Sequence, residues 1–64
     1  MRDFETLKPL DDMDLDSRID CMAEICKRMR IETYSLQQYR SRGLPENYAF
    51  KPIIKVIIDK YKNC

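Results

Sequence analysis

The chain contains no histidine and only one glycine, Gly43. Without an imidazole, a cysteine nucleophile has no base to activate it, and a zinc site would need unusual ligands because the sequence also has no CxxC pair. We therefore predict that the protein is not an enzyme and that it uses no metal, no cofactor and no small-molecule substrate. The single glycine also argues against a linker or a low-complexity polymer.

The sequence also lacks a long apolar run. No stretch is long enough to cross a bilayer, and the amino terminus shows no apolar run followed by a small-residue cleavage site. We expect a cytoplasmic protein with no membrane partner. Three cysteines, Cys21, Cys26 and Cys64, cannot all pair within one chain, so reduced thiols are the simpler expectation. Cys26 is predicted to be a small buried residue and Cys64 an exposed thiol.

The length and the charge distribution indicate the number of domains and the kind of partner that the chain suits. A chain of 64 residues forms one domain, and folding at this size hides only about 60% of the unfolded surface, so self-association would add stability. Residues 1–20 carry seven acids and three bases, whereas residues 21–64 carry nine bases and four acids. The basic part suits a polyanionic partner, although two ordinary solvated faces would explain the same charges.

The apolar spacing predicts a helix that begins after Asp14 or Asp16 and ends near Arg30. Apolar residues recur along it at steps of three and four: Ile19, Met22, Ala23, Cys26 and Met29. Residues 1–14 form an acidic amino-terminal arm in which Pro9 allows only a short helical turn. The domain proper is expected to span residues 15–64.

A second helix is predicted after a break of about three residues that begins at Ile31. Thr33 would cap this helix, and Gly43 would end it after Arg42. At about 100° per residue, Leu36 and Tyr39 point inward. Tyr34, Gln38 and Ser41 lie opposite them, with Gln37 on the flank.

The carboxy-terminal segment contains an apolar run that fits either a helix or a strand: Ile53, Ile54, Val56, Ile57, Ile58 and Tyr61. Its β-branched residues suit a strand, but the four-residue spacing gives a wide helical stripe, and we favour a helix that begins near Pro52. The predicted fold is therefore all-α, with three to four helices. The run carries more apolar surface than two helices can cover, which predicts a homodimer.

The stretch MAEICKRMRIETYSLQQYRSRGLP, residues 22–45, resembles the helix-turn-helix of Cro-like and YdaS-like phage and prophage regulators. It covers 24 of the 64 residues. Cys26 stands where that family prefers alanine, Ile31 where the turn buries an aliphatic residue, and Tyr39 where the family has tryptophan. Arg30 departs from the pattern, which has a left-handed glycine there. The segment from Leu36 to Pro45 is also similar to the opening motif of MerR-like and excisionase-like proteins.

Both resemblances imply DNA binding. The first hypothesis is a sequence-specific transcription regulator that binds double-stranded DNA as a homodimer. The residues assigned to base readout are Tyr34, Gln37, Gln38 and Ser41, since amides match the donor and acceptor edge of adenine. The residues assigned to phosphate contacts are Lys27, Arg28, Thr33, Arg40 and Arg42. A solvated polar face is the plainer interpretation of the same residues. The alternative functions are a protein-interaction module, such as an antitoxin or inhibitor, and an excisionase-like protein that bends DNA.

Overall fold

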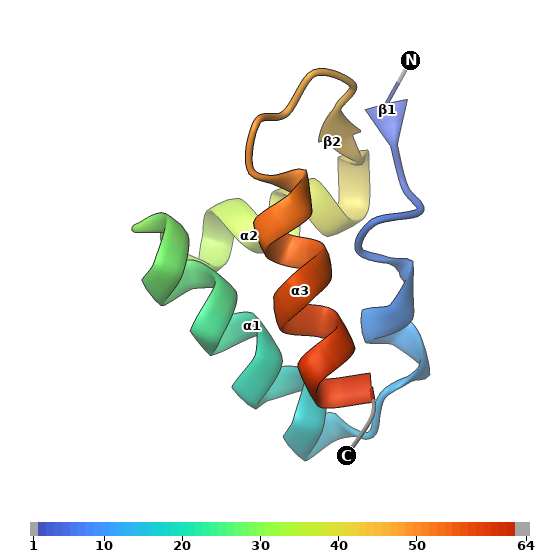
Figure 1. Cartoon of the computed structure of the whole chain (residues 1–64), viewed down its shortest axis with the longest axis vertical. Coiled ribbons are helices and arrows are strands. Elements are labelled where there is room, and N and C mark those ends of the chain that lie inside the picture. The colour runs from blue at the N-terminus through green and yellow to red at the C-terminus, as the bar shows by residue number, and fades with distance from the viewer. Residues whose placement is uncertain (1, 63–64) are drawn as a thin grey trace.

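The computed structural model describes residues 2–62 and is mostly helical. Three α-helices, α1 (Leu15–Met29), α2 (Thr33–Arg42) and α3 (Lys51–Lys62), make up most of the described chain. A short strand, β1 (Arg2–Asp3), and a 3₁₀ helix, η1 (Lys8–Asp12), precede α1, and a second short strand, β2 (Leu44–Pro45), lies between α2 and α3. Figure 1 shows α1 and α3 side by side and running in opposite directions. No helix among residues 2–62 combines the length and apolar character that a bilayer span requires.

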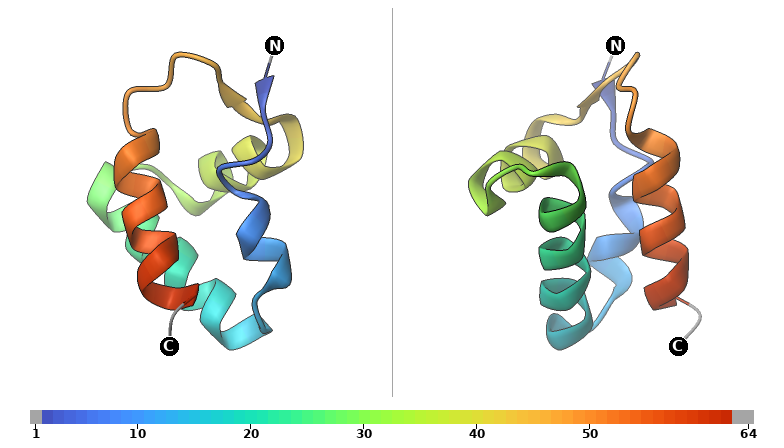
Figure 2. Two further views of the ribbon diagram at one scale, coloured as in Figure 1. Left: turned by 45° about the vertical axis from the view of Figure 1, so that its right-hand side comes forward. Right: turned by 60° about the vertical axis from the view of Figure 1, so that its left-hand side comes forward.

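The hydrophobic core lies where α1, α2, α3 and the amino-terminal segment meet. Its fully buried side chains come from five different elements: Leu10, Cys21, Ile25, Leu36, Leu44 and Ile54. Leu7 is also buried, so residues 1–14, predicted as an arm, contribute two leucines to the core. The two views of Figure 2 show this segment packed alongside the helices.

Helix α1 begins after Asp14, as predicted, and its buried face agrees with the predicted stripe at Met22, Cys26 and Met29 but not at Ile19 and Ala23. Its buried residues are Cys21, Met22, Ile25 and Cys26, whereas Ile19 is 55% exposed and Ala23 is exposed. Both α3 and η1 pack on the side of α1 that carries Cys21 and Ile25. The buried face of α1 is therefore rotated from the predicted stripe toward Cys21 and Ile25, because α3 and η1 pack on that side.

The connection from α1 to α2 depends on a left-handed residue. Arg30 has φ 54° and ψ 44°, the conformation that the resemblance placed there for glycine. Helix α2 then starts one position earlier than the prediction implied, because Glu32 occupies the cap position and its carbonyl accepts the Leu36 amide at 3.2 Å. Thr33 is consequently the first helical residue and not the cap. Only Ile31 and Glu32 follow Arg30 before α2 begins, which places the two helices in direct contact.

Gly43 ends α2 and leaves room for β1 to pair with β2, forming a small sheet that the sequence did not predict. Its φ of 88° is unfavourable for other residues, and a Cβ there would lie 2.7 Å from the Cβ of Arg2. This close approach lets β1 pair antiparallel with β2, with Arg2 opposite Pro45 and Asp3 opposite Leu44. The all-α expectation is thus corrected by a sheet whose two-residue strands are too short to show an alternating pattern.

The carboxy-terminal run is helical, as favoured, and the strand alternative is wrong. Helix α3 buries Ile54, Ile57 and Ile58. The start of α3 is tied to the amino terminus through Asp3, whose carboxylate lies 2.8 Å from the Lys51 ammonium. That carboxylate also accepts the Thr6 hydroxyl at 2.7 Å and the Glu5 amide at 2.8 Å. These contacts, above all the one with Lys51, hold the pKa of Asp3 well below its ordinary value.

Replacing Arg30 with glycine should stabilise the fold. The left-handed conformation costs a residue with a Cβ roughly 1 to 2 kcal/mol, and glycine avoids that cost. Glycine also increases the entropy of the unfolded chain, which cancels part of the gain. We therefore expect a net stabilisation of about 0.5 to 1 kcal/mol. Urea denaturation measures the change. The matched control is Arg28→Gly inside α1, which should lose about 1 kcal/mol. Equal losses in both variants would contradict the interpretation.

Replacing Asp3 with asparagine should destabilise the fold by about 1 to 2 kcal/mol at neutral pH, because charge-assisted hydrogen bonds are lost. The folded pKa of Asp3 lies below its unfolded value of about 4, so the contribution is present above that pH and declines as the pH falls below it. Denaturation curves of the wild type and Asp3→Asn should therefore converge in acid. A difference that stays constant down to strongly acidic pH would contradict this origin.

Candidate functional site

Helix α2 exposes one polar face and buries the other. Leu36 is fully buried, and Tyr39 packs partly buried against the same core. On the other side, Tyr34 is 68% exposed, and Gln37 and Ser41 are also exposed. Gln38 is partly buried and lies at the edge of this face. The structure therefore brings three of the four predicted readout residues to solvent on one side of α2.

Basic and hydroxyl groups flank both ends of that face. Lys27 and Thr33 are exposed near the junction of α1 and α2, and Arg42 is exposed at the end of α2. Arg30 is also exposed at this junction, and sequence reasoning did not assign it to the site. Its position in the turn between the two helices was the signal that could have included it. We refer to these four residues and the exposed face of α2 together as the α2 surface.

Arg28 is exposed and lines two hollows. One of them is shared with Lys27 and Arg30, so the structure keeps Arg28 beside the α2 surface. The other lies between α1 and α3, where Arg28 is joined by Pro52, Ile53 and Val56. The sequence could not show this second set of neighbours, because it depends on which side of α1 the third helix covers.

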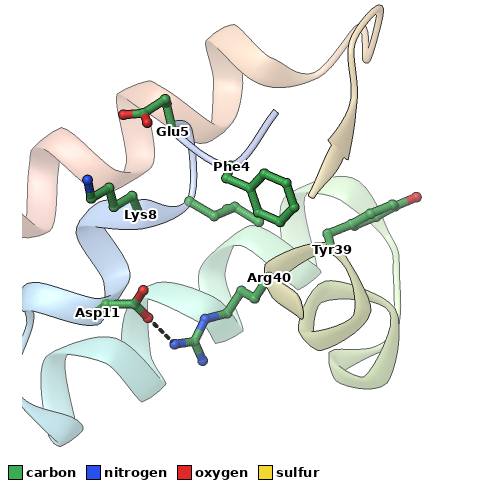
Figure 3. A pocket seen from close by; sticks show the side chains of 7 residues that line it. Phe4, Glu5, Lys8, Asp11, Tyr39 and Arg40 are labelled. Atoms are coloured by element: carbon green, nitrogen blue, oxygen red, sulfur yellow. Dashed lines mark hydrogen bonds and ion pairs between the residues drawn. The ribbon is translucent and has the colours of Figure 1, made fainter. Parts of the chain in front are cut away.

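Arg40 is turned away from the α2 surface. Its guanidinium forms an ion pair with Asp11 of η1 and also lies 3.8 Å from the sulfur of Met22. Figure 3 shows the guanidinium reaching across a shallow pocket toward Asp11, with Phe4 and Tyr39 on the opposite side. The acidic amino-terminal segment thus pairs with a base that the sequence assigned to DNA phosphate.

Tyr39 takes part in an aromatic cluster and not in the exposed face. Its ring lies 5.3 Å from that of Tyr48, which in turn lies 5.6 Å from Phe50. Burial and the neighbouring Tyr39 raise the pKa of Tyr48 to about 12. This packing joins the end of α2 to the loop before α3 and agrees with the predicted structural role of Tyr39.

The two cysteines within the described residues are free and buried. Burial, with a smaller effect from Glu24, raises the pKa of Cys21 to about 11, and burial also raises the pKa of Cys26. Thiols in this state have little nucleophilic character near neutral pH. Cys64 lies outside the described residues. Within residues 2–62, no group of three or more Cys, Asp or Glu side chains is placed to hold a metal ion.

The α2 surface has the chemistry of a polyanion interface. It combines amide and hydroxyl groups, which donate and accept hydrogen bonds, with three exposed cations. No side chain caps the first turn of α2, so its backbone amides add donors beside Thr33. The exposed carboxylate of Glu32 adds a negative charge at the amino-terminal end of α2.

Comparisons of the chain with protein-family models, with curated proteins and with solved structures give no match. The resemblance carried by residues 22–45 therefore stays a prediction. The case for a function rests on the geometry of α1 and α2 and on the groups that they expose.

Proposed function

We propose that the protein is a sequence-specific transcription regulator that binds double-stranded DNA as a homodimer, with α1 and α2 acting as a helix-turn-helix. The observation that carries the proposal is the arrangement of α2, which buries Leu36 and presents Tyr34, Gln37 and Ser41 to solvent next to a three-residue turn. Such a helix can enter the major groove while the preceding helix crosses the backbone.

The shape of the molecule supports this proposal. Helix α2 has ten residues, which corresponds to a length of about 15 Å, and a major groove about 12 Å wide admits an α-helix. In the right-hand view of Figure 2, α2 projects from the side of the pair formed by α1 and α3. Its exposed residues, Tyr34, Gln37 and Ser41, are not covered by the third helix.

The exposed side chains divide into two roles. Gln37, with Gln38 at the edge, has an amide that can donate to N7 of adenine and accept from its N6 amino group in the major groove. Tyr34 and Ser41 can reach bases or neighbouring phosphates. Phosphate contacts are proposed for Lys27, Arg28, Arg30, Thr33 and Arg42. Arg40 is left out because it forms an ion pair with Asp11 of η1.

Selection of bound sequences from a random duplex library tests the readout. We expect an inverted repeat with half-sites about 10 base pairs apart, because a twofold dimer presents two copies of α2 about one helical turn apart.

The double variant Gln37→Ala, Gln38→Ala should retain non-specific binding but lose discrimination at the adenine positions by about 1 to 3 kcal/mol per contact. The control Asn47→Ala removes an exposed amide from the loop before α3 and should recover the wild-type repeat. Unchanged sequence preference in the double variant would show that α2 does not read bases.

The salt dependence of binding to random duplex DNA tests the phosphate contacts. Lys27→Gln and Arg42→Gln should each weaken binding and reduce the slope of log affinity against log salt by about 1. The reason is that each wild-type cation releases roughly one counterion from the DNA when it contacts a phosphate. The control Lys62→Gln removes an exposed charge at the far end of α3 and should leave the slope unchanged. Absence of any binding at low salt would exclude a DNA-binding role.

A protein-interaction module, such as an antitoxin or inhibitor, is the second candidate. It is favoured by the apolar side chains that the helices leave in solvent: Leu15 at 63%, Ile19 at 55% and Val56 at 69% exposure. Such residues suit a partner surface. This function is preferred if the protein fails to bind duplex DNA at low salt.

A further inference from the structure

Arg40 continues a row of α2 residues that the proposed function assigns to DNA. Thr33, Gln37 and Arg40 follow one another at steps of four and three, and such residues are neighbours on a helix surface, with about 5 to 6 Å between their Cβ atoms. A residue beside a base-reading glutamine faces the edge of the groove, where the phosphates lie. The position of Arg40 on α2 therefore suits a phosphate contact, although its guanidinium points toward η1 in the free protein.

The guanidinium of Arg40 is held by a carboxylate of the amino-terminal segment. Asp11 of η1 forms an ion pair with it across 29 residues of sequence. Arginine binds carboxylates and phosphates through the same planar set of N–H donors. Asp11 therefore occupies donors that a DNA phosphate would use.

This ion pair lies at the surface, where water and salt weaken it. The Asp11 side chain is 64% exposed and the Arg40 side chain is 25% exposed. Exposed ion pairs change an equilibrium constant by about fivefold at most. A phosphate of a bound duplex can therefore displace the carboxylate of Asp11.

Burial, more than this ion pair, holds η1 in place. Leu10 of η1 is fully buried, and η1 packs against both α1 and α3. Arg40 also lines a hollow of about 250 Å³ with Phe4 and Tyr39, which gives its guanidinium space to turn away from Asp11 (Figure 3). Arg40 can thus change its partner while the helices keep their positions.

We propose that Arg40 contacts a DNA phosphate in the complex and that Asp11 competes with the DNA for this guanidinium. The acidic amino-terminal segment thereby lowers the affinity of the α2 surface for duplexes of any sequence, because phosphate contacts carry no sequence information. This competition rests on the proposed function, since it regulates binding at the same surface.

The affinity of the full chain for random duplex DNA tests the competition. Asp11→Asn should bind about two- to fivefold more tightly than the wild type, because Arg40 no longer has a charged competitor. The matched control is Asp12→Asn, which removes the same charge from the next, exposed residue of η1 and leaves the ion pair of Arg40 intact. It should gain little at about 0.15 M salt, where charges are screened over about 8 Å.

Adding Arg40→Gln to Asp11→Asn identifies the source of the gain. The double variant should lose the tighter binding and reduce the slope of log affinity against log salt by about 1, since one phosphate contact is removed. Urea denaturation should show that Asp11→Asn is no more stable than the wild type, so its tighter binding does not come from a more stable fold.

Two results would overturn the competition while the wild type still binds DNA: an Asp11→Asn variant that binds no more tightly than Asp12→Asn, or a gain that persists with Arg40→Gln. Either result leaves the proposed function intact. Absence of binding by both the wild type and Asp11→Asn would instead refute the proposed function, and the competition with it.

Discussion

The rest of the structure depends on the left-handed backbone at Arg30. It stops α1 after Met29 and, with only Ile31 and Glu32 following, sets α2 against the end of α1. Leu36 can then enter the same core as Ile25 and Ile54, and the opposite side of α2 is left in solvent. The proposed DNA-binding surface therefore originates in one unfavourable dihedral angle, whose cost is offset by the burial of α2.

The amino-terminal segment completes this arrangement. Leu7 and Leu10 close the core from the side that α2 and α3 leave open, and two acids hold the segment in place. Asp3 binds Lys51 at the start of α3, and Asp11 binds Arg40 of α2. The charge asymmetry of the chain thus serves the fold, because two acids of the amino-terminal part pair with two bases of the carboxy-terminal part.

The α2 surface adjoins the side of α1 that α3 covers. Arg28 lines one hollow with Lys27 and Arg30 and a second hollow with Ile53 and Val56 of α3. The periodicity of α1 alone could not give both sets of neighbours, because the second set depends on where the third helix packs.

The sequence alone determined the positions of the three helices, the turn near Arg30, the end of α2 at Gly43 and the exposure of Tyr34 and Ser41. It placed Gln38 opposite the core and Gln37 on the flank, whereas Gln37 is exposed and Gln38 is partly buried. These features follow from local rules, since helix periodicity, glycine and proline act within a few residues. The tertiary structure alone decided which face of α1 is buried, that β1 pairs with β2, and where Arg28 and Arg40 point. Arg40 meets Asp11 across 29 residues of sequence. No local pattern carries such a contact, because its partner depends on how the elements pack and not on the spacing along any one of them.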